Sequence, residues 1–180
     1  MKALSGETGA AKRLAVGTVA GVAAVSLLGA CSTVTKQQAA AVVNGHVIRL
    51  SDVAETAKQL RAANLDFSEE IVVTALIAAP LLHETVAASG SWKPDATYAN
   101  VVNAMPGATD TTKTFVSTVA LLQSAQMTSA DVAQYRTDLK QARISVNPRF
   151  GSFVPSDQGP VYFSLGQQAP DWIAAAPASK

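Results

Sequence analysis

The side chain in this 180-residue chain best suited to do chemistry is its only cysteine, Cys31, because a thiolate is a stronger nucleophile than any hydroxyl. Cys31 follows an apolar run, residues 14–28, and the small residues Gly29 and Ala30. Basic residues precede the run: Lys2, Lys12 and Arg13. A basic segment, an apolar segment and small residues before a cleavage point are typical of a secretory signal peptide. The pattern predicts cleavage between Ala30 and Cys31.

The stretch Leu28-Gly29-Ala30-Cys31 resembles the lipobox of bacterial lipoproteins. In that family the cysteine thiol takes a diacylglyceryl thioether, and cleavage then frees its amine for a further fatty-acyl chain such as palmitate. The resemblance implies a signal peptide over residues 1–30, lipid attachment at Cys31, and a location on the extracytoplasmic side of the cell membrane. One acyl chain holds a protein only reversibly, whereas two hold it durably.

Two other interpretations of this segment are weaker. The apolar run could be a transmembrane anchor, but it is shorter than the ~20 residues that a bilayer core requires and is interrupted by Gly17, Gly21 and Ser26. A lone cysteine is often a buried core residue. Here the polar residues 32–38 follow Cys31, so we interpret residues 31–39 as a polar tether.

The charge and length of the remaining chain exclude some partners. Without residues 1–30, the chain keeps 11 basic and 12 acidic residues and is almost neutral. It has no basic patch interleaved with aromatic residues, so we expect no nucleic-acid partner. The 150 residues suit one domain that buries roughly 70% of its unfolded surface. No second cysteine exists to form a disulfide.

The segment His83-Glu84-Thr85-Val86-Ala87 is close to the zinc-protease motif, but Ala87 replaces the second histidine. That motif needs two imidazoles four residues apart on one helix face. The other histidine, His46, is far away in sequence, so we expect no metal and interpret His83 as a partly buried helix residue bonded to a carbonyl or to water. Motifs for acyl transfer, nucleotides and calcium are absent, so we expect no cofactor and no enzyme.

Asn44-Gly45 lies between two short β-branched runs and predicts a β-hairpin, because both residues tolerate the positive φ of a type I′ turn. Ser51 is a candidate N-cap for a helix over residues 52–63. Asp66 and Glu69 form a capping-box pattern before the apolar residues 71–79. We expect Pro80 to kink or interrupt this central helix, which then continues to Gly90.

Three further helices follow in the prediction. Pro94 is a candidate first residue of a short helix, Thr109 or Asp110 a cap for the next, and Ser129 with Asp131 the start of the last. Aromatic residues fall on the apolar stripes of these helices and are predicted to be core residues: Tyr98, Phe115 and Tyr135. Ile144–Val146 alternates as a strand does, and residues 156–180 are rich in Pro, Gly and Gln, which predicts a loop or tail.

Residues 42–53, Val-Val-Asn-Gly-His-Val-Ile-Arg-Leu-Ser-Asp-Val, resemble the opening of the SurA-type chaperone N-terminal domain. That resemblance implies a hairpin leading into a helix bundle, with a later strand returning to pair with the hairpin, a role that residues 144–146 fit. Residues 147–151 also look like the segment after the last helix in lipid-anchored members. The resemblance spans residues 40–155. Together with the five helices that the sequence pattern predicts, it leads us to expect an α+β, mostly helical fold with a small sheet formed by the hairpin and the later strand.

SurA proteins hold unfolded envelope proteins, and many also carry parvulin-type prolyl isomerase domains, for which this chain has no room. We therefore expect a lipid-anchored chaperone-like protein that binds unfolded or extended polypeptides of the cell envelope. Two alternatives stay open: an accessory lipoprotein for one dedicated partner, and an envelope hydrolase with an unrecognised site. The helical middle has no motif that assigns peptide-binding residues.

Overall fold

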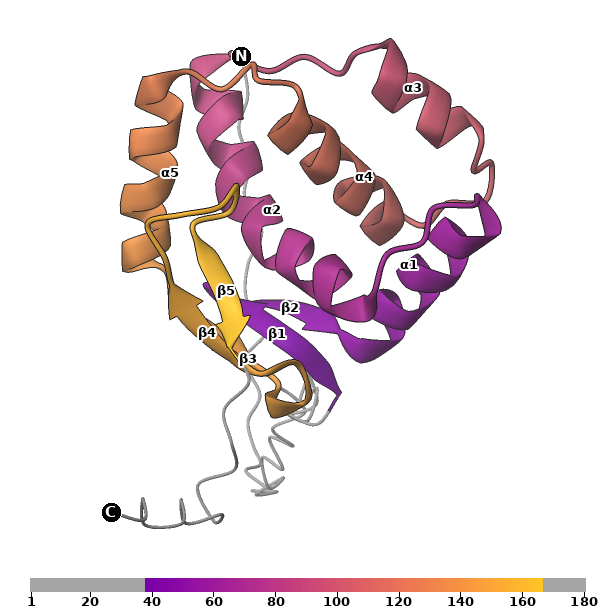
Figure 1. The fold of residues 1–180 in the computed structure, drawn as a ribbon, viewed down its shortest axis with the longest axis horizontal. Helices are drawn as coiled ribbons and strands as arrows, with labels where there is room; N and C mark the ends of the chain where they lie inside the picture. Colours follow the sequence, from indigo (N-terminus) through magenta and orange to yellow (C-terminus); the bar gives the residue numbers. More distant parts are fainter. Residues whose placement is uncertain (1–37, 167–180) are drawn as a thin grey trace, which may run out of the picture. The chain divides into compact units, whose positions relative to one another are not determined.

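The structure is a computed structural model that describes residues 38–166. The predicted signal peptide, Ala30, Cys31 and most of the predicted tether therefore lie outside the described residues. Within them, five helices and two small antiparallel sheets confirm the predicted α+β, mostly helical fold (Figure 1). The strands gather at one end of the helices.

The first sheet is built from the predicted hairpin and the returning strand. Its strands are β1 (Ala39–Val43), β2 (His46–Arg49) and β3 (Ile144–Val146), in the order β2-β1-β3. Asn44 and Gly45 have φ angles of 50° and 89°, as a type I′ turn requires. Asn44 also ties the turn to β3, because its side-chain Oδ1 accepts the backbone N–H of Arg143 at 2.8 Å.

Gly45→Val should lower the free energy of unfolding by about 1–3 kcal/mol, because a β-branched residue resists positive φ. A Cβ atom at Gly45 would meet nothing within 4 Å, so the loss comes from backbone conformation alone. Gly45→Asn, which tolerates this conformation, is the matched control and should lose less. Chemical denaturation measures both, and an unchanged midpoint for the valine variant would argue against the turn's role.

The helices are α1 (Leu50–Ala62), α2 (Glu69–Ser89), α3 (Ala96–Asn103), α4 (Asp110–Gln123) and α5 (Ser129–Gln141). Two predicted starts are wrong. Helix α1 begins at Leu50, after Arg49, so Ser51 is not its N-cap. Helix α2 begins after Ser68, whose side chain accepts the N–H of Ile71, rather than at a capping box from Asp66.

Each of the last three helices starts after a residue whose side chain accepts a backbone N–H of the first turn. Asp95, not Pro94, is the boundary of α3, because its carboxylate accepts the N–H of Tyr98 at 2.9 Å. Thr109 caps α4, as predicted. Helix α5 opens with a capping box between Thr128 and Asp131, so Asp131 has the predicted place and Thr128 is the cap.

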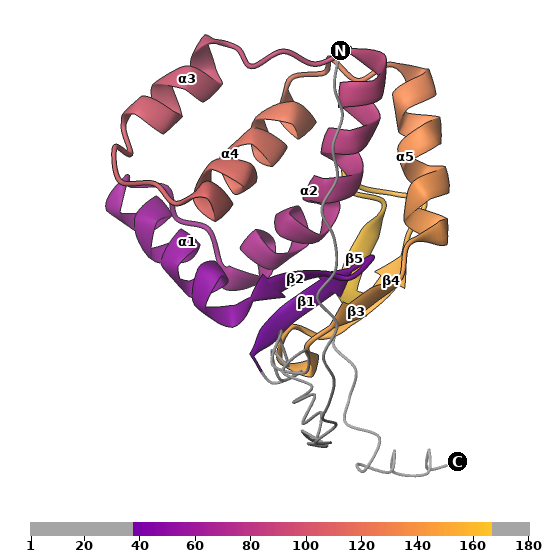
Figure 2. The ribbon, with the colours of Figure 1, turned by 180° about the vertical axis from the view of Figure 1, so that it is seen from behind.

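Helix α2 is the centre of the core. It runs between α4 and α5 (Figures 1 and 2) and continues through Pro80 to Gly90, which has a φ of 67°. It is long and apolar enough to cross a bilayer, but 61% of its most apolar window is buried inside the protein. This burial is the pattern of a core helix in a folded domain, as the apolar run over residues 71–79 predicted.

The prediction of a loop or tail over residues 156–180 is wrong for residues 163–166. These residues form β5 (Phe163–Gly166), which pairs antiparallel with β4 (Ser152–Pro155) after the 3-10 turn η2 (Pro148–Phe150). The hydroxyl of Tyr135 donates to the carbonyl of Val161 at 2.9 Å, and Phe163 is buried. The domain therefore extends past residue 155. Ala39, assigned to the tether, is already part of β1.

Candidate functional site

A cavity of about 400 Å³ lies between α1, α3 and α4, within the range of roughly 300–1,000 Å³ that ligand pockets occupy. We call it the α3 cavity. Helices α1, α3 and α4 and residues 65–67 supply its apolar walls: Leu60, Leu65, Phe67, Tyr98, Val101, Phe115, Val116, Val119 and Ala120. Polar residues complete it: Asp95, Thr97, Gln123 and Ser124.

Helix α3 forms one wall of this cavity without being part of the core. None of its residues is buried, although Tyr98 and Val101 pack against the core cluster at a spacing of three residues. Tyr98 meets Trp92 edge to face, with ring centroids 6.2 Å apart. Tyr98 was predicted to be a core residue and instead is half-buried in the cavity wall, whereas Phe115 and Tyr135 are buried as predicted.

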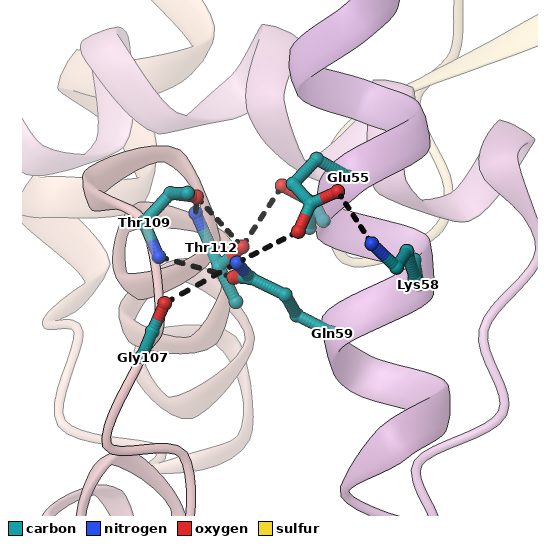
Figure 3. Close-up of polar contacts among 7 residues, drawn as sticks. Glu55, Lys58, Gln59, Gly107, Thr109 and Thr112 are labelled. Atoms are coloured by element: carbon teal, nitrogen blue, oxygen red, sulfur yellow. Dashed lines mark hydrogen bonds and ion pairs between the residues drawn. The ribbon is translucent and has the colours of Figure 1, made fainter.

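Two glutamine side chains hold the segments at either end of α3. Before the helix, Gln126 accepts the N–H of Lys93 at 3.0 Å and donates to its carbonyl at 3.4 Å. After the helix, Gln59 of α1 accepts the N–H of Thr109 at 3.0 Å and donates to the carbonyl of Gly107 at 3.3 Å (Figure 3). Each amide thus uses both its donor and its acceptor on backbone groups.

Figure 3 shows how the second glutamine is itself held. Its amide also donates to Glu55 at 3.1 Å, and Glu55 is paired with Lys58 at 3.4 Å. Beside it, the buried hydroxyls of Thr56 and Thr112 join α1 to α4 at 3.1 Å. These bonds fix α1 against the start of α4. Helix α3, in contrast, is attached through its ends and through the side chains that line the cavity.

A second cavity, of about 510 Å³, brings together the two histidines that are far apart in sequence. His46 from β2 and His83 from α2 line it with Asp52 and Asp110, and the rest of its wall is mainly apolar. We call it the histidine cavity. Within residues 38–166, no group of three or more His, Cys, Asp or Glu side chains could hold a metal ion.

The ring of His83 is partly buried, as predicted, and its Nε2 lies beside hydroxyl groups rather than beside the predicted carbonyl. Nε2 lies 3.0 Å from Ser117 Oγ and 3.1 Å from Thr118 Oγ1. Both hydroxyls also donate to the carbonyl of Thr114, at 2.9 and 2.7 Å. Each hydroxyl can act as donor or acceptor toward the ring, so the two contacts suit either neutral tautomer of His83.

The position of Ser117 decides what the pair of His83 and Ser117 can do. A serine becomes a nucleophile when an adjacent imidazole nitrogen accepts its proton. Here Ser117 is not among the residues that line the histidine cavity, so this cavity does not place a substrate beside its hydroxyl. The contact therefore serves to join α2 to α4, and it gives no support to the hydrolase alternative.

Burial lowers the pKa of His83 below its ordinary value of 6.5, which makes stability depend on pH. The folded state favours the neutral ring, so with respect to this group the protein is most stable above the unfolded-state pKa. This stability is lost as the pH falls below about 6.5, because the unfolded chain then binds a proton more readily than the folded chain does. We expect the free energy of unfolding to decline as the pH falls below about 6.5. His83→Gln should remove this component in a denaturation series, and an identical decline in the variant would contradict the assignment.

The other shifted groups lie away from both cavities. The Thr128 backbone N–H, followed by the hydroxyls of Thr128, Ser89 and Ser91, lowers the pKa of Asp131 to about 2. Burial raises the pKa of Tyr135. The stabilising contribution of the Asp131 carboxylate is lost only as the pH falls from about 4 towards 2. These two groups join α5 to its neighbours.

The sequence did not point to the residues of the α3 cavity as a site. Leu65 and Phe67 carry a weak signal, since they alternate with the exposed Asp66, but Val119 and Val101 look like ordinary core positions. Comparisons of the chain with protein-family models, curated proteins and solved structures find no match. The resemblance of residues 42–53 to the SurA-type domain therefore stays a prediction.

Proposed function

We propose that this chain is a lipid-anchored, extracytoplasmic chaperone-like protein that binds unfolded or extended polypeptides of the cell envelope. The observation that supports the proposal is the α3 cavity, which has apolar walls and is covered on one side by a helix with no buried residue. Apolar side chains of a client would enter this cavity. The anchor at Cys31 would keep the cavity at the membrane surface, where its concentration relative to emerging clients is raised.

The expected affinity follows from the size of the contact. Shielding ~400 Å² of apolar client surface contributes roughly 10 kcal/mol before costs. Lost translational freedom and the ordering of the client offset much of this gain. Binding should be micromolar or weaker and reversible, as a protein that must release its clients requires. It needs no ATP, because burial of apolar surface is the whole driving force.

An interface for one dedicated partner would call for a contiguous, exposed apolar patch. Within residues 38–166, the large hydrophobic side chains that are exposed are Ile71, at 49%, and Val154, at 43%. Ile71 lies in the first turn of α2 and Val154 lies on β4, in separate elements. The proposal therefore rests on the α3 cavity rather than on a flat apolar patch.

Light scattering from a chemically denatured client tests the proposal. The full chain in phosphatidylcholine nanodiscs should slow aggregation at a stoichiometric excess, without ATP, whereas empty nanodiscs should not. A proline-limited refolding assay should show no acceleration, since the proposed activity is burial of apolar surface alone. Failure to suppress aggregation of several clients would favour the dedicated-partner alternative, which crosslinking in intact cells would reveal as a single stoichiometric partner.

Cys31→Ser should abolish lipid attachment and leave the signal segment uncleaved, because a hydroxyl cannot replace the thiolate in the transfer. Metabolic labelling with a fatty-acid analogue, followed by electrophoresis, measures both effects. Ser32→Ala is the matched control and should keep the label. Persistent label on the Cys31→Ser protein would show that the lipid is attached elsewhere.

A further inference from the structure

The polar residues of the α3 cavity gather at one end of it. Asp95 and Thr97 lie at the start of α3, and Gln123 and Ser124 lie at the end of α4. The bonds between Gln126 and the backbone of Lys93 hold these two helix ends side by side. The opposite end, formed by the last turn of α1 and residues 65–67, is apolar. The cavity therefore has a polar end and an apolar end.

Asp95 alone is charged among the described residues that line this cavity. Its Oδ1 accepts the N–H of Tyr98 at 2.9 Å, which orients the carboxylate at the start of α3. Oδ2 has no hydrogen-bond partner within residues 38–166 and stays available to a ligand. Lys93, the cation nearest in sequence, does not line the cavity.

The segments that line the cavity carry charges of both signs in almost equal number: residues 50–67 and 92–124 together contain five carboxylates and four Lys or Arg residues. The carboxylate of Asp95 is therefore the charge that a ligand in the cavity meets at the polar end. A ligand with a negative group beside its apolar part would be repelled at the polar end, and a ligand with a positive group would be attracted. The cavity thus distinguishes among apolar ligands by charge.

We propose that the α3 cavity selects extended polypeptide segments in which a lysine or arginine neighbours the apolar side chain that enters the cavity. The inference rests on the proposed function, since it assumes that the cavity receives polypeptide. The apolar side chain occupies the space between Phe67, Val101 and Phe115, and the cation meets the free oxygen of Asp95 at the polar end. This contact is solvent-exposed, so its effect on affinity is modest and is screened by salt.

Asp95→Asn tests the inference with little risk to the fold, because asparagine is as good an N-cap as aspartate. Asp66→Asn is the matched control: it removes the same charge from an exposed position between Leu65 and Phe67 that does not line the cavity. The probes are two short fluorescent peptides that share a Leu-Phe pair and differ only in flanking lysines or glutamines. Binding is measured by anisotropy with the full chain in phosphatidylcholine nanodiscs, whose lipid is zwitterionic.

The wild-type chain and Asp66→Asn should bind the lysine peptide about two- to fivefold more tightly than the glutamine peptide at low salt, with a smaller ratio at high salt. In Asp95→Asn the ratio should fall to about one while the glutamine peptide binds as before. Equal binding of the two peptides by the wild-type chain, or a preference that persists in Asp95→Asn, would overturn the inference and leave the proposed function intact. If neither peptide binds, the proposed function itself fails.

Discussion

Gly151→Ala is expected to lower the free energy of unfolding by about 3 kcal/mol or more, one of the two largest losses that the structure predicts. Gly151 has a φ of 93° and a ψ of −156°, a conformation that is essentially confined to glycine. A Cβ atom at this position would also overlap the carbonyl oxygen of Gly166 in β5. Because the obstacle is backbone, it cannot move aside without breaking the β4–β5 pairing.

Gly107→Ala is the matched control for this prediction. Its Cβ atom would meet nothing within 4 Å, and the backbone of Gly107 is not in the positive-φ region. The change should alter stability by less than about 0.5 kcal/mol. Urea denaturation of the two variants measures the difference. Equal midpoints would mean that the close approach of Gly151 to β5 does not contribute to the stability of the domain.

Tyr135→Ala should cost about 3–5 kcal/mol, because it removes a fully buried aromatic side chain and leaves a cavity. Tyr135 lies in α5, and its hydroxyl donates to the carbonyl of Val161, just before β5 begins. The loss should therefore also loosen the last strand. Hydrogen exchange at residues 161–166 should rise together with the fall in the denaturation midpoint.

Tyr135→Phe separates the hydrogen bond from the packing. The ring stays, but the carbonyl of Val161 loses its donor, and the expected loss is about 1–2 kcal/mol. A phenylalanine variant as unstable as the alanine variant would show that the bond, rather than the ring, dominates. A variant as stable as the wild-type protein would contradict the role assigned to the hydroxyl.

The parts of the fold that depend on local chemistry were predictable from the sequence. Asn44-Gly45 specifies a two-residue turn by itself, and the cap at Thr109 needs only the next helical turn. Helix starts were misplaced where two candidate caps lie close together, as Asp66 and Ser68 do, since packing of the preceding segment chooses between them. Strand β5 was missed because its pairing with β4 and its bond to Tyr135 link distant residues.

The candidate site was less predictable than the fold. Tyr98 lies on an apolar stripe that looks the same whether its helix is packed in the core or covers a cavity. What distinguishes the two cases is the position of α3. Gln59 and Gln126 set this position through hydrogen bonds to backbone groups that are between 33 and 50 positions away in the sequence. The cavity that His46 and His83 share was not predictable either, because the hairpin and α2 pack together only in the folded chain.

The central claim is that the α3 cavity receives apolar client side chains, and filling the cavity tests it most directly. Ala120 lines the cavity, so Ala120→Phe should occupy it, whereas Ala99→Phe adds the same group to an exposed position of α3 that does not line it. The measurement is the affinity of the wild-type chain and of each variant, as full chains in nanodiscs, for a permanently unfolded fluorescent client. The variants are compared under conditions in which all three chains are equally stable. We predict at least tenfold weaker binding for Ala120→Phe, a loss of about 1.4 kcal/mol, and unchanged binding for Ala99→Phe. A folded Ala120→Phe protein that binds the client as the wild-type chain does would contradict the account.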